Sequence, residues 1–485
     1  MEQMKRQFLW VKIGVGVMAA LWLGFVISGT VCRYLLNWSS TFDFGIFSQM
    51  YYYMKETGLP LTTCERDMLL SHFAVHMSPA YYLLLPVYWL FPNPITLFVM
   101  QAAVIALGVV PCYLIARDKG LPPLAVLAFC AVYCLYPSLI GGAFYDFHEN
   151  VMLTGFILWA LYFMQKKRFL WMYLFLLLTA LVKEDAPVYV ACIGLFLLFH
   201  EREYKHGAAA FAGAVVYFVC VFLWMKNHGN GVMIGRYDNI MPDEDLGLIG
   251  IFKVILVNPA YLLQEMFNMP EKVEFFFQMM IPLAFLPFFT IKVWRYILMI
   301  PFVLWNLLPD YQYQHSIYFQ YTFGASAMLF YMAILNYAEL RAWLGERKRK
   351  EKSLAWTRWL SAGILGLAVC LALGVNLSTV SSKGDYVRRY ARDREAVGQV
   401  NEILDSIPKE ASVQASTFYV PRISMRDVVY RIEGDKLLKF DTDYAVIDLR
   451  PGVEDEPQQQ VQAYEEAGYQ LTEYMEDKIA VLKKG

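Results

Sequence analysis

The sequence has few charged residues for its length, and they are unevenly distributed. Only 18% of the 485 residues are charged and 58% are hydrophobic, whereas a soluble protein carries about 25% charged residues. The shortage is confined to residues 7–377, and residues 378–485 have the composition of an ordinary soluble domain. The net charge of −1 gives nucleic acid no electrostatic attraction. The sequence therefore predicts a polytopic membrane protein that does not bind nucleic acid.

Several features that would indicate other classes of protein are missing. The eight cysteines lie mostly inside apolar stretches, without the spacing of a zinc site or of an external disulfide framework. The first apolar run follows Lys5, Arg6 and Lys12 without a small-residue cleavage site, which favours an uncleaved signal anchor. The sequence contains no GxSxG, HExxH or Walker motif. Any chemistry must therefore come from polar clusters between the apolar stretches.

The lengths of the apolar stretches predict about eleven membrane spans, because about 20 apolar residues cross a bilayer as a helix. With the N-terminus in the cytoplasm, the loops predicted to lie inside carry basic residues such as Arg117, Lys166 and the run Arg347–Lys350, as the positive-inside rule requires. Residues 76–92 are apolar enough for a twelfth span, but we place them as a juxtamembrane or re-entrant hairpin within the first external loop. The spans are expected near residues 10–31, 95–116, 121–140, 150–165, 169–183, 186–200, 207–225, 274–290, 294–309, 317–338 and 357–377.

This threading divides the chain into two domains. Residues 1–377 are predicted to form a transmembrane domain in the plasma membrane, with a first external loop at about 32–94. Residues 378–485 are predicted to form a small extracytoplasmic α/β domain. Its expected helices are 385–407 and 458–467, and its expected strands are 413–417, 428–432, 444–448 and 479–483.

Three consecutive charges interrupt what would otherwise be a continuous span. Lys183, Glu184 and Asp185 lie inside the apolar run 176–199, and a charge at mid-bilayer costs roughly 2.5–3.5 kcal/mol. The triplet is therefore expected at a membrane surface or in a polar cavity. Lys183 could meet a phosphate, and Glu184 or Asp185 could orient it or bind a metal. The alternative is a self-neutralising turn between two helices.

Two further clusters lie in the first external loop. Asp43 follows the first span by about a dozen residues, and its carboxylate could take a proton from an acceptor hydroxyl. It could equally cap a helix that starts at Phe44. His72 and His76 share one face if they are helical, a spacing that can bind a metal or a phosphate. The alternative for them is hydrogen bonding to backbone groups at the interface.

Other polar clusters are predicted at the same membrane face. Asp146, His148 and Glu149 open the fourth span, where a carboxylate beside an imidazole can fix its tautomer or keep it charged; helix capping and solvation are the alternative. Arg236 is a candidate for a phosphate or diphosphate group. The remaining candidates could hydrogen-bond sugar hydroxyls or belong to an interfacial aromatic belt: His315, Gln320 and Tyr321.

The order and spacing of these clusters resemble a known family. FDFGIFSQ, HFAVHMSP, PNPITLFVMQA, DFHEN and LVKEDAP, together with ASVQASTFYVPRISMRDVVY and TDYAVIDLR in the tail, resemble a family of predicted membrane proteins known as domain of unknown function 2079. The family often reads FHPE, whereas here Glu149 comes one place earlier and Asn150 takes the glutamate position. This departure weakens any role carried over to that carboxylate.

The family in turn resembles the GT-C glycosyltransferases, which are integral membrane enzymes that use lipid-phosphate-linked sugars. This resemblance implies a GT-C-like helical fold and transfer of a sugar from a polyprenyl-phosphate donor at the outer face. Asp43 matches the acidic residue of the first external loop, which serves these enzymes as a base or a metal ligand. A divalent metal held by Asp43 with Glu184 or Asp185 is one option, although not all enzymes of this class use one. The acceptor stays open.

Two other functions are compatible with the sequence. A transporter or flippase of a lipid-linked substrate would predict internal repeats and charges near mid-bilayer, whereas the polar clusters here lie at span ends. In a cell-envelope assembly protein, the domain at 378–485 would carry the function. Such a protein would tolerate replacement of Asp43 and of Lys183–Asp185.

Overall fold

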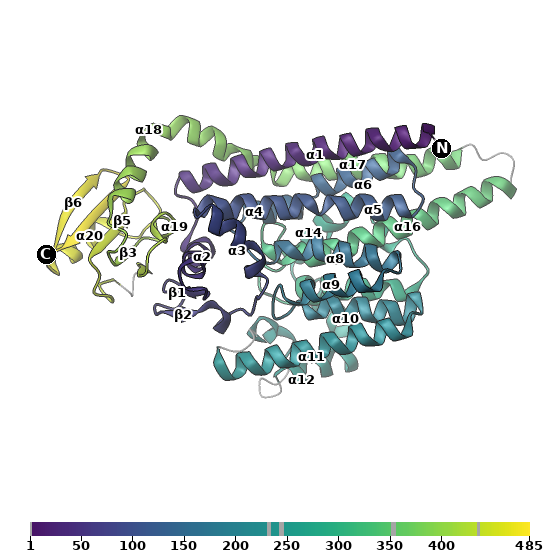
Figure 1. Cartoon of the computed structure of the whole chain (residues 1–485), viewed down its shortest axis with the longest axis horizontal. Coiled ribbons are helices and arrows are strands. Elements are labelled where there is room, and N and C mark those ends of the chain that lie inside the picture. Colours follow the sequence, from purple (N-terminus) through teal and green to yellow (C-terminus); the bar gives the residue numbers. More distant parts are fainter. Residues whose placement is uncertain (1, 230–233, 242–246, 351–355, 434–436) are drawn as a thin grey trace.

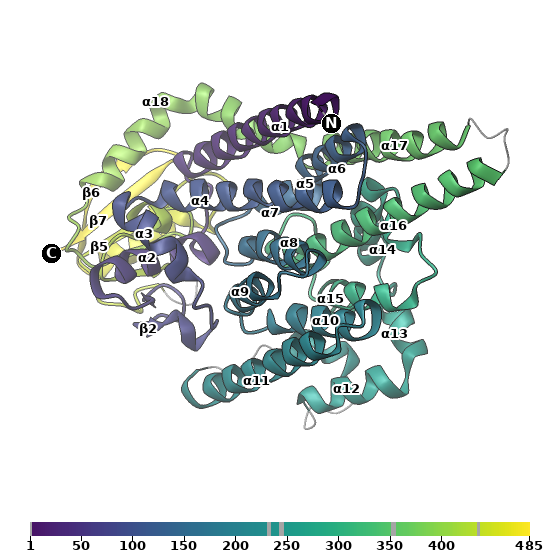
Figure 2. The ribbon, with the colours of Figure 1, turned by 45° about the vertical axis from the view of Figure 1, so that its right-hand side comes forward.

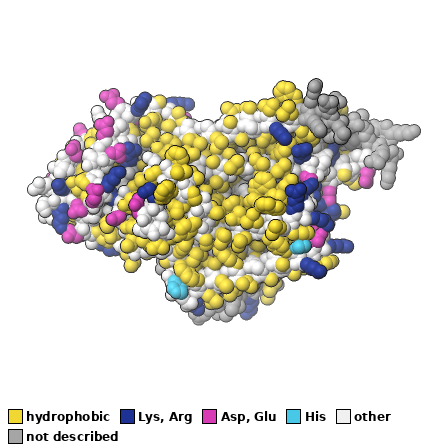
Figure 3. All heavy atoms as spheres, viewed as in Figure 1, with side chains coloured by type: hydrophobic (Ala, Val, Ile, Leu, Met, Phe, Trp, Pro, Cys, Tyr) yellow, Lys and Arg dark blue, Asp and Glu magenta, His cyan; other side chains and the backbone are white. Residues whose placement is uncertain are grey.

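The computed structural model describes residues 2–229, 234–241, 247–350, 356–433 and 437–485. Figure 1 shows a bundle of helices with a small sheet domain at one end. On the face shown in Figure 3, hydrophobic side chains cover the middle of the bundle. Charged side chains gather over the sheet domain and at the opposite ends of the helices. This distribution is the one expected for a protein whose bundle lies in a bilayer.

Six helical segments in the described part of the chain are long and apolar enough to cross a membrane. They belong to α1 (Glu2–Leu35), α4 (Pro94–Leu107) with α5 (Val109–Asp118), α6 (Pro123–Leu135) with α7 (Pro137–Phe144), α11 (Tyr204–His228), α16 (Phe323–Lys350) and α17 (Trp356–Thr379). Shorter apolar helices lie among them in the bundle (Figure 2): α8 (Val151–Gln165), α9 (Phe169–Ala180), α10 (Pro187–Phe196) with η3 (Leu197–Glu201), and the segment η8 (Val293–Met299), α15 (Ile300–Phe302) and η9 (Val303–Leu307).

One predicted span is not a single helix. Residues 274–290 are not a single helix, because α14 (Pro270–Met280) is followed by the 3-10 turns η6 (Ile281–Leu283) and η7 (Leu286–Phe288). Ala284 and Phe285 between these turns are left-handed. Pro282 and Pro287 explain the break, since proline removes a helical donor and clashes with the preceding turn. The predicted span 294–309 is likewise divided, into η8, α15 and η9, and the other predicted spans fall on α-helices.

The first loop contains short elements that pack on the end of the bundle. They are η1 (Thr41–Gly45), α2 (Ile46–Thr57), the antiparallel pair β1 (Leu61–Thr62) and β2 (Leu70–Ser71), η2 (His72–Ala74) and α3 (Tyr81–Leu90). With ten residues, α3 is about 15 Å long at 1.5 Å per residue, half the thickness of a bilayer core. This length agrees with the prediction of a juxtamembrane hairpin at 76–92. Between α11 and α14 lie η4 (Ile234–Ile240), α12 (Gly247–Val257) and α13 (Pro259–Glu265).

The loops predicted to be basic come together at the opposite end of the bundle. Lys166 forms an ion pair with Asp118 at 2.7 Å, and Lys167 forms one with Glu203 at 2.7 Å. Arg295 pairs with the carboxylate of Glu339 in α16. The first two contacts join three loops, and the third joins Arg295 of η8 to α16. The side chains of the predicted basic run 347–350 lie outside the described residues.

The C-terminal portion folds as a mixed five-stranded sheet with helices packed on it. Turn η11 (Ser381–Gly384) and helix α18 (Asp385–Ser406) lead from α17 to β3 (Val413–Ala415), α19 (Val420–Ile423), β4 (Val429–Arg431), β5 (Tyr444–Asp448), α20 (Pro457–Glu466), β6 (Tyr469–Met475) and β7 (Ile479–Lys484). The strand order is β4-β3-β5-β7-β6, with β3 parallel to both neighbours and β7 antiparallel to β5 and β6. The predicted helices and strands are confirmed. Strand β6 was not predicted, because it is an edge strand that is mostly exposed and lacks an apolar face.

Candidate functional site

A cavity of about 530 Å³ opens between the first loop and the end of the bundle. Its walls come from η1 and α2, from the segment 65–76, from the turns that precede α8 and α10, and from residues 311–321. Four of the charged side chains predicted from sequence share it: Asp43, His148, Lys183 and Arg236. Segments more than 190 residues apart in the chain therefore meet at one polar hollow.

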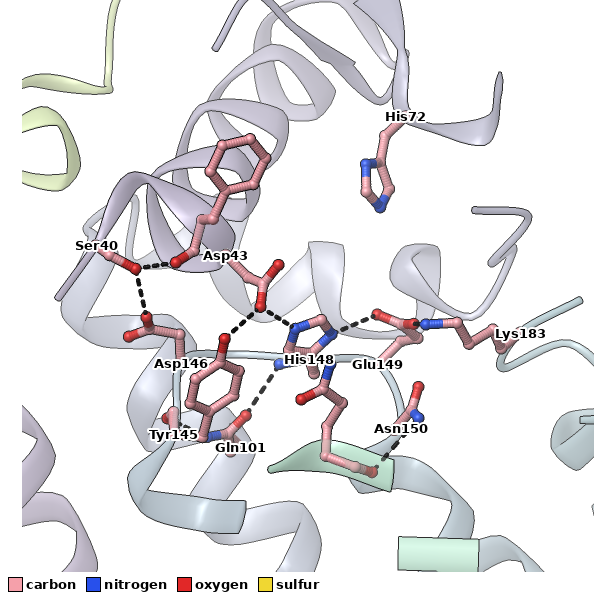
Figure 4. A network of polar contacts seen from close by, with 12 residues as sticks. Ser40, Asp43, His72, Gln101, Tyr145, Asp146, His148, Glu149, Asn150 and Lys183 are labelled. Atoms are coloured by element: carbon pink, nitrogen blue, oxygen red, sulfur yellow. Dashed lines mark hydrogen bonds and ion pairs between the residues drawn. The ribbon is translucent and has the colours of Figure 1, made fainter. Parts of the chain in front are cut away.

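The Asp43 carboxylate is held by two residues of the bundle. Its Oδ2 lies 2.8 Å from His148 Nε2 and accepts a hydrogen bond of 2.8 Å from the Tyr145 hydroxyl. Both contacts go to the same oxygen, as Figure 4 shows. The Asp43 side chain is 27% exposed, and it lines the cavity. Helix capping does not account for Asp43, because α2 begins after Gly45 and has no side-chain cap.

Glu149 lies at the centre of a second set of contacts beneath the cavity (Figure 4). Its Oε1 accepts a hydrogen bond of 2.7 Å from Lys183 Nζ, and its Oε2 accepts one of 2.9 Å from the Tyr81 hydroxyl. The same oxygen lies 3.5 Å from His148 Nδ1. Glu149 is fully buried and Lys183 is 4% exposed. Glu149 thus links His148, which holds Asp43, to Lys183.

The two histidines of the first loop are both paired with carboxylates. His72 Nδ1 lies 2.7 Å from Glu65 Oε2, and its Nε2 lies 3.1 Å from the Tyr81 hydroxyl. His76 Nδ1 lies 2.8 Å from Glu184 Oε1. Both histidines line the cavity. The ring nitrogens of both histidines therefore contact side chains, and the alternative of hydrogen bonding to backbone groups is wrong for them.

Arg236 lies against an aromatic wall of the cavity. Its guanidinium is 4.8 Å from the ring centre of Tyr311 and 5.2 Å from that of Tyr321. The turn that carries it, η4, is tied to the bundle because the Tyr237 hydroxyl donates a 3.0 Å hydrogen bond to the backbone oxygen of Leu304. A guanidinium on aromatic rings is favourable for cation–π contact. The cavity therefore has cations from two separate segments, Lys183 and Arg236.

The family profile described as "Predicted membrane protein (DUF2079)" matches residues 33–475 of this sequence. The chain belongs to this family. A comparison with curated proteins finds no match. The fold is similar to that of ArnT from Cupriavidus metallidurans bound to undecaprenyl phosphate, with a TM-score of 0.55 and 13% identity over 98% of this chain and 97% of that chain. The apo state of the same protein gives a TM-score of 0.52 and 12% identity over the same shares.

A weaker likeness is found to the Archaeoglobus fulgidus oligosaccharyltransferase tethered with an acceptor peptide, with a TM-score of 0.44 and 12% identity over 91% of this chain and 69% of that one. At such identities the comparison with ArnT establishes the fold and nothing about activity. The DUF2079 chain therefore shares its fold with ArnT, in agreement with the GT-C-like helical fold that the family resemblance implied.

Several candidate residues of the DUF2079 protein lie away from the cavity wall. Asp146 forms an ion pair with Arg33 of α1 and is buried. His315 is also buried, and Lys272 is among the charges that act on it. Neither these two nor Glu184 and Asp185 are among the described residues that line the cavity. Gln320 and Tyr321 do line it.

Other lining residues were missed by the sequence analysis. Tyr145 directly precedes the predicted cluster at 146–149, so its position was a usable signal. Phe319, Tyr313, Glu65 and Arg66 also line the cavity. Aromatic residues are common at the ends of membrane spans, and the sequence alone does not separate those that face a cavity.

The carboxylates proposed as metal ligands do not form a metal site in the DUF2079 protein. Among the described residues, no group of three or more His, Cys, Asp and Glu side chains is arranged to hold a metal ion. Glu184 is occupied by His76, and Asp43 by His148 and Tyr145. Burial, and then the neighbouring Glu184, raise the pKa of Asp185 to about 7.

We expect the Asp43–His148 ion pair to persist across neutral pH. Burial opposes the charge of His148, but Asp43 and then Glu149 raise its pKa to about 9. Burial also opposes the charge of Asp43, but His148 and then Tyr145 lower its pKa to about 2. The raised histidine pKa means that its stabilising effect is complete below the ordinary histidine pKa of 6.5 and is lost as pH rises through about 9. The lowered pKa of Asp43 means that its stabilising effect is present above the ordinary aspartate pKa of 3.8 and is lost as pH falls through about 2.

Thermal unfolding of the detergent-solubilised protein between pH 7 and 9.5 checks this expectation. The wild type should lose more stability over this interval than His148→Gln, which cannot titrate at that position. An equal loss in both proteins would mean that His148 is not charged at neutral pH.

Proposed function

We propose that this protein is a GT-C glycosyltransferase that moves a sugar from a polyprenyl-phosphate-linked donor to an acceptor at the outer face of the plasma membrane. The observation that supports this most is that Asp43, Lys183 and Arg236 share one cavity at the end of an apolar bundle. A carboxylate for the acceptor and cations for a phosphate are the groups that such a transfer needs. The sugar, hexose or pentose, and the acceptor stay open.

The donor's chemistry accounts for the position of the cavity. An isoprenoid tail has to stay in lipid, while its phosphate needs cations at the level of the headgroups. Lys183 and Arg236 provide them, one from the turn between α9 and α10 and one from η4. His72 and His76 line the same hollow as further candidate contacts. The neighbour ArnT is itself described as bound to undecaprenyl phosphate, which is a lipid of this class.

Aromatic side chains beside Asp43 offer a place for the sugar. Phe319 packs edge-on against Tyr145 and against Tyr313, with ring centres 4.7 and 4.6 Å apart. Tyr145 is also the residue that donates to Asp43. Aromatic rings bury large apolar area, and Tyr adds a polar end. A sugar ring on these side chains would lie in the cavity that Asp43 shares with Lys183 and Arg236.

The transfer then proceeds with balanced charges. The acceptor oxygen forms a bond to the anomeric carbon, and the bond from that carbon to the phosphate oxygen breaks. The electron pair stays on the departing phosphate, where Lys183 and Arg236 stabilise the negative charge. The proton of the acceptor passes to the carboxylate of Asp43. His148 stays paired with Oδ2 of that carboxylate and orients it.

The direction of the chain in the membrane is part of the proposal. Figure 1 shows the sheet domain and the first-loop elements α2 and β2 at one end of the bundle, and α2 forms part of the cavity wall. The ion pairs of the basic loops lie where α5 and α8 end and α11 begins, away from the sheet domain. By the positive-inside rule, the basic end faces the cytoplasm. The N-terminus would then be cytoplasmic, and the domain at 378–485 would be extracytoplasmic, following a transmembrane domain at 1–377.

The test is donor turnover by the purified chain in lipid nanodiscs. The assay offers polyprenyl-phosphate-linked hexoses and pentoses labelled in the sugar and follows release of polyprenyl phosphate. We expect release with at least one donor, and Arg236→Ala should weaken donor binding by about 10- to 100-fold, since a charged hydrogen bond contributes about 1.5–3 kcal/mol. Arg202→Ala, at the opposite end, is the control.

Two results would contradict the proposal. Movement of an intact donor between the leaflets of proteoliposomes, without cleavage, would indicate a flippase. Equal donor affinity of Arg236→Ala and the wild type would remove Arg236 from the phosphate site.

A further inference from the structure

The C-terminal domain packs directly on the short segment that carries Asp43. The Thr41 hydroxyl donates a hydrogen bond of 3.0 Å to the backbone oxygen of Thr417, and the Thr41 amide donates one of 3.3 Å to the Thr417 hydroxyl. Thr417 lies between β3 and α19, and helix α19 packs against η1. The views in Figures 1 and 2 both place the sheet domain beside α2.

Contacts with the domain continue on both sides of Asp43. Before it, the guanidinium of Arg431 lies 4.6 Å from the ring centre of Phe42. After it, a Cβ placed on Gly45 would lie 3.1 Å from Cγ1 of Val420, so any side chain at residue 45 would push against α19. The domain therefore bounds the backbone of η1 on the side away from the bundle.

This interface is a packed core and not a loose contact. One buried apolar cluster combines Ile46 and Cys64 of the first loop with residues of α18, β3, α19, β4, β5 and β7. Polar contacts accompany it: the Ser424 hydroxyl donates to that of Ser48 at 2.7 Å, and Thr63 donates to the backbone oxygen of Val429 at 2.7 Å. The burial of these groups means that the domain and the loop hold one relative position.

We infer that the C-terminal domain, through Thr417, Val420 and Arg431, sets the position of Asp43 in the cavity. The inference rests on the proposed function, which assigns Asp43 its role. His148 and Tyr145 hold the carboxylate from the bundle, while Thr417 and Val420 hold its backbone from the domain. These three domain residues are positioning residues, and the domain is part of the catalytic unit. A displacement of about 1 Å between reacting groups costs about 100-fold in rate.

A pair of compensating substitutions tests the contact between Gly45 and Val420. Gly45→Ala adds a methyl group that displaces the segment, so the transfer rate kcat should fall about 10-fold with the KM for donor unchanged. Val420→Ala removes the opposing methyl group and should cost less than about 3-fold. The double variant should recover to the level of Val420→Ala. Val461→Ala is the matched control, because Val461 is buried in the other apolar cluster of the same domain, and its kcat should equal that of the wild type.

Hydrogen exchange provides a readout that does not need transfer activity. Gly45→Ala and Thr417→Val should speed exchange of the amides at 41–45 about 10-fold, and Val461→Ala should leave them unchanged. Unchanged exchange in the first two variants overturns the inference, and so does a low kcat of Gly45→Ala that Val420→Ala does not restore. If the wild type transfers no sugar, the proposed function fails, and exchange alone decides whether the domain positions the segment.

Discussion

Asp43→Asn is expected to abolish sugar transfer, with kcat reduced by about 10²- to 10⁴-fold, the contribution typical of a positioned proton acceptor. The amide has nearly the same shape as the carboxylate but cannot accept the proton of the acceptor hydroxyl. It also replaces the anion that faces the imidazole of His148 at 2.8 Å. Single-turnover transfer from a labelled polyprenyl-phosphate sugar in nanodiscs measures the effect, with donor affinity measured separately.

The control for this variant is Asp118→Asn. Asp118 is also a carboxylate in an ion pair, with Lys166 at 2.7 Å, but it lies at the opposite end of the bundle. Its kcat should stay within about 3-fold of the wild type, because surface ion pairs contribute at most about 1 kcal/mol. Full transfer by Asp43→Asn would remove Asp43 from the reaction, whatever the position of the carboxylate in the cavity.

Lys183→Met is expected to have the largest effect on stability among single substitutions in the cavity. Its ammonium pairs at 2.7 Å with Glu149, which is fully buried. Removal of one partner of such a pair leaves an uncompensated buried charge and costs about 3–5 kcal/mol. Denaturant unfolding in detergent should show this loss. Lys55→Met, whose partner Glu56 is half exposed, should cost less than about 1 kcal/mol.

The double variant Lys183→Met with Glu149→Gln separates stability from function. Neutralising Glu149 removes the buried charge, so most of the lost stability should return. The amide oxygen introduced by Glu149→Gln can still accept the hydrogen bond that the Tyr81 hydroxyl donates to Glu149. Transfer should stay low, because the cavity still lacks the Lys183 cation at the phosphate. Recovery of transfer together with stability would show that Lys183 serves the fold and not the donor.

The sequence was sufficient to bring the main groups of the site together. Asp43, His148, Lys183 and Arg236 were placed at one membrane face because basic loops marked the opposite face and each group sits at the end of a span. In the structure these four side chains line one cavity. This part of the prediction required only the number and direction of the spans between the groups. The broken helix at 274–290 follows all four groups in the sequence and leaves it intact.

The pairing of charges inside the site could not be predicted in the same way. Lys183 was expected to act beside its chain neighbours Glu184 and Asp185, but it pairs with Glu149, 34 residues earlier. Glu184 pairs with His76. Which partner a side chain pairs with depends on the direction in which it leaves its turn. This direction follows no periodic pattern in the sequence. The contribution of the C-terminal domain to the position of Asp43 is equally a property of the packed interface.

The most direct test of the account is a cryo-EM structure of the full chain in nanodiscs with a polyprenyl-phosphate-linked sugar and the Asp43→Asn substitution. We expect the phosphate within hydrogen-bonding distance of Lys183 or Arg236, the sugar ring on Phe319 and Tyr145, and residue 43 facing the anomeric carbon. Density for the lipid phosphate at the basic end of the bundle, beside Lys166 and Arg295, with an empty cavity at Asp43, would contradict the central claim.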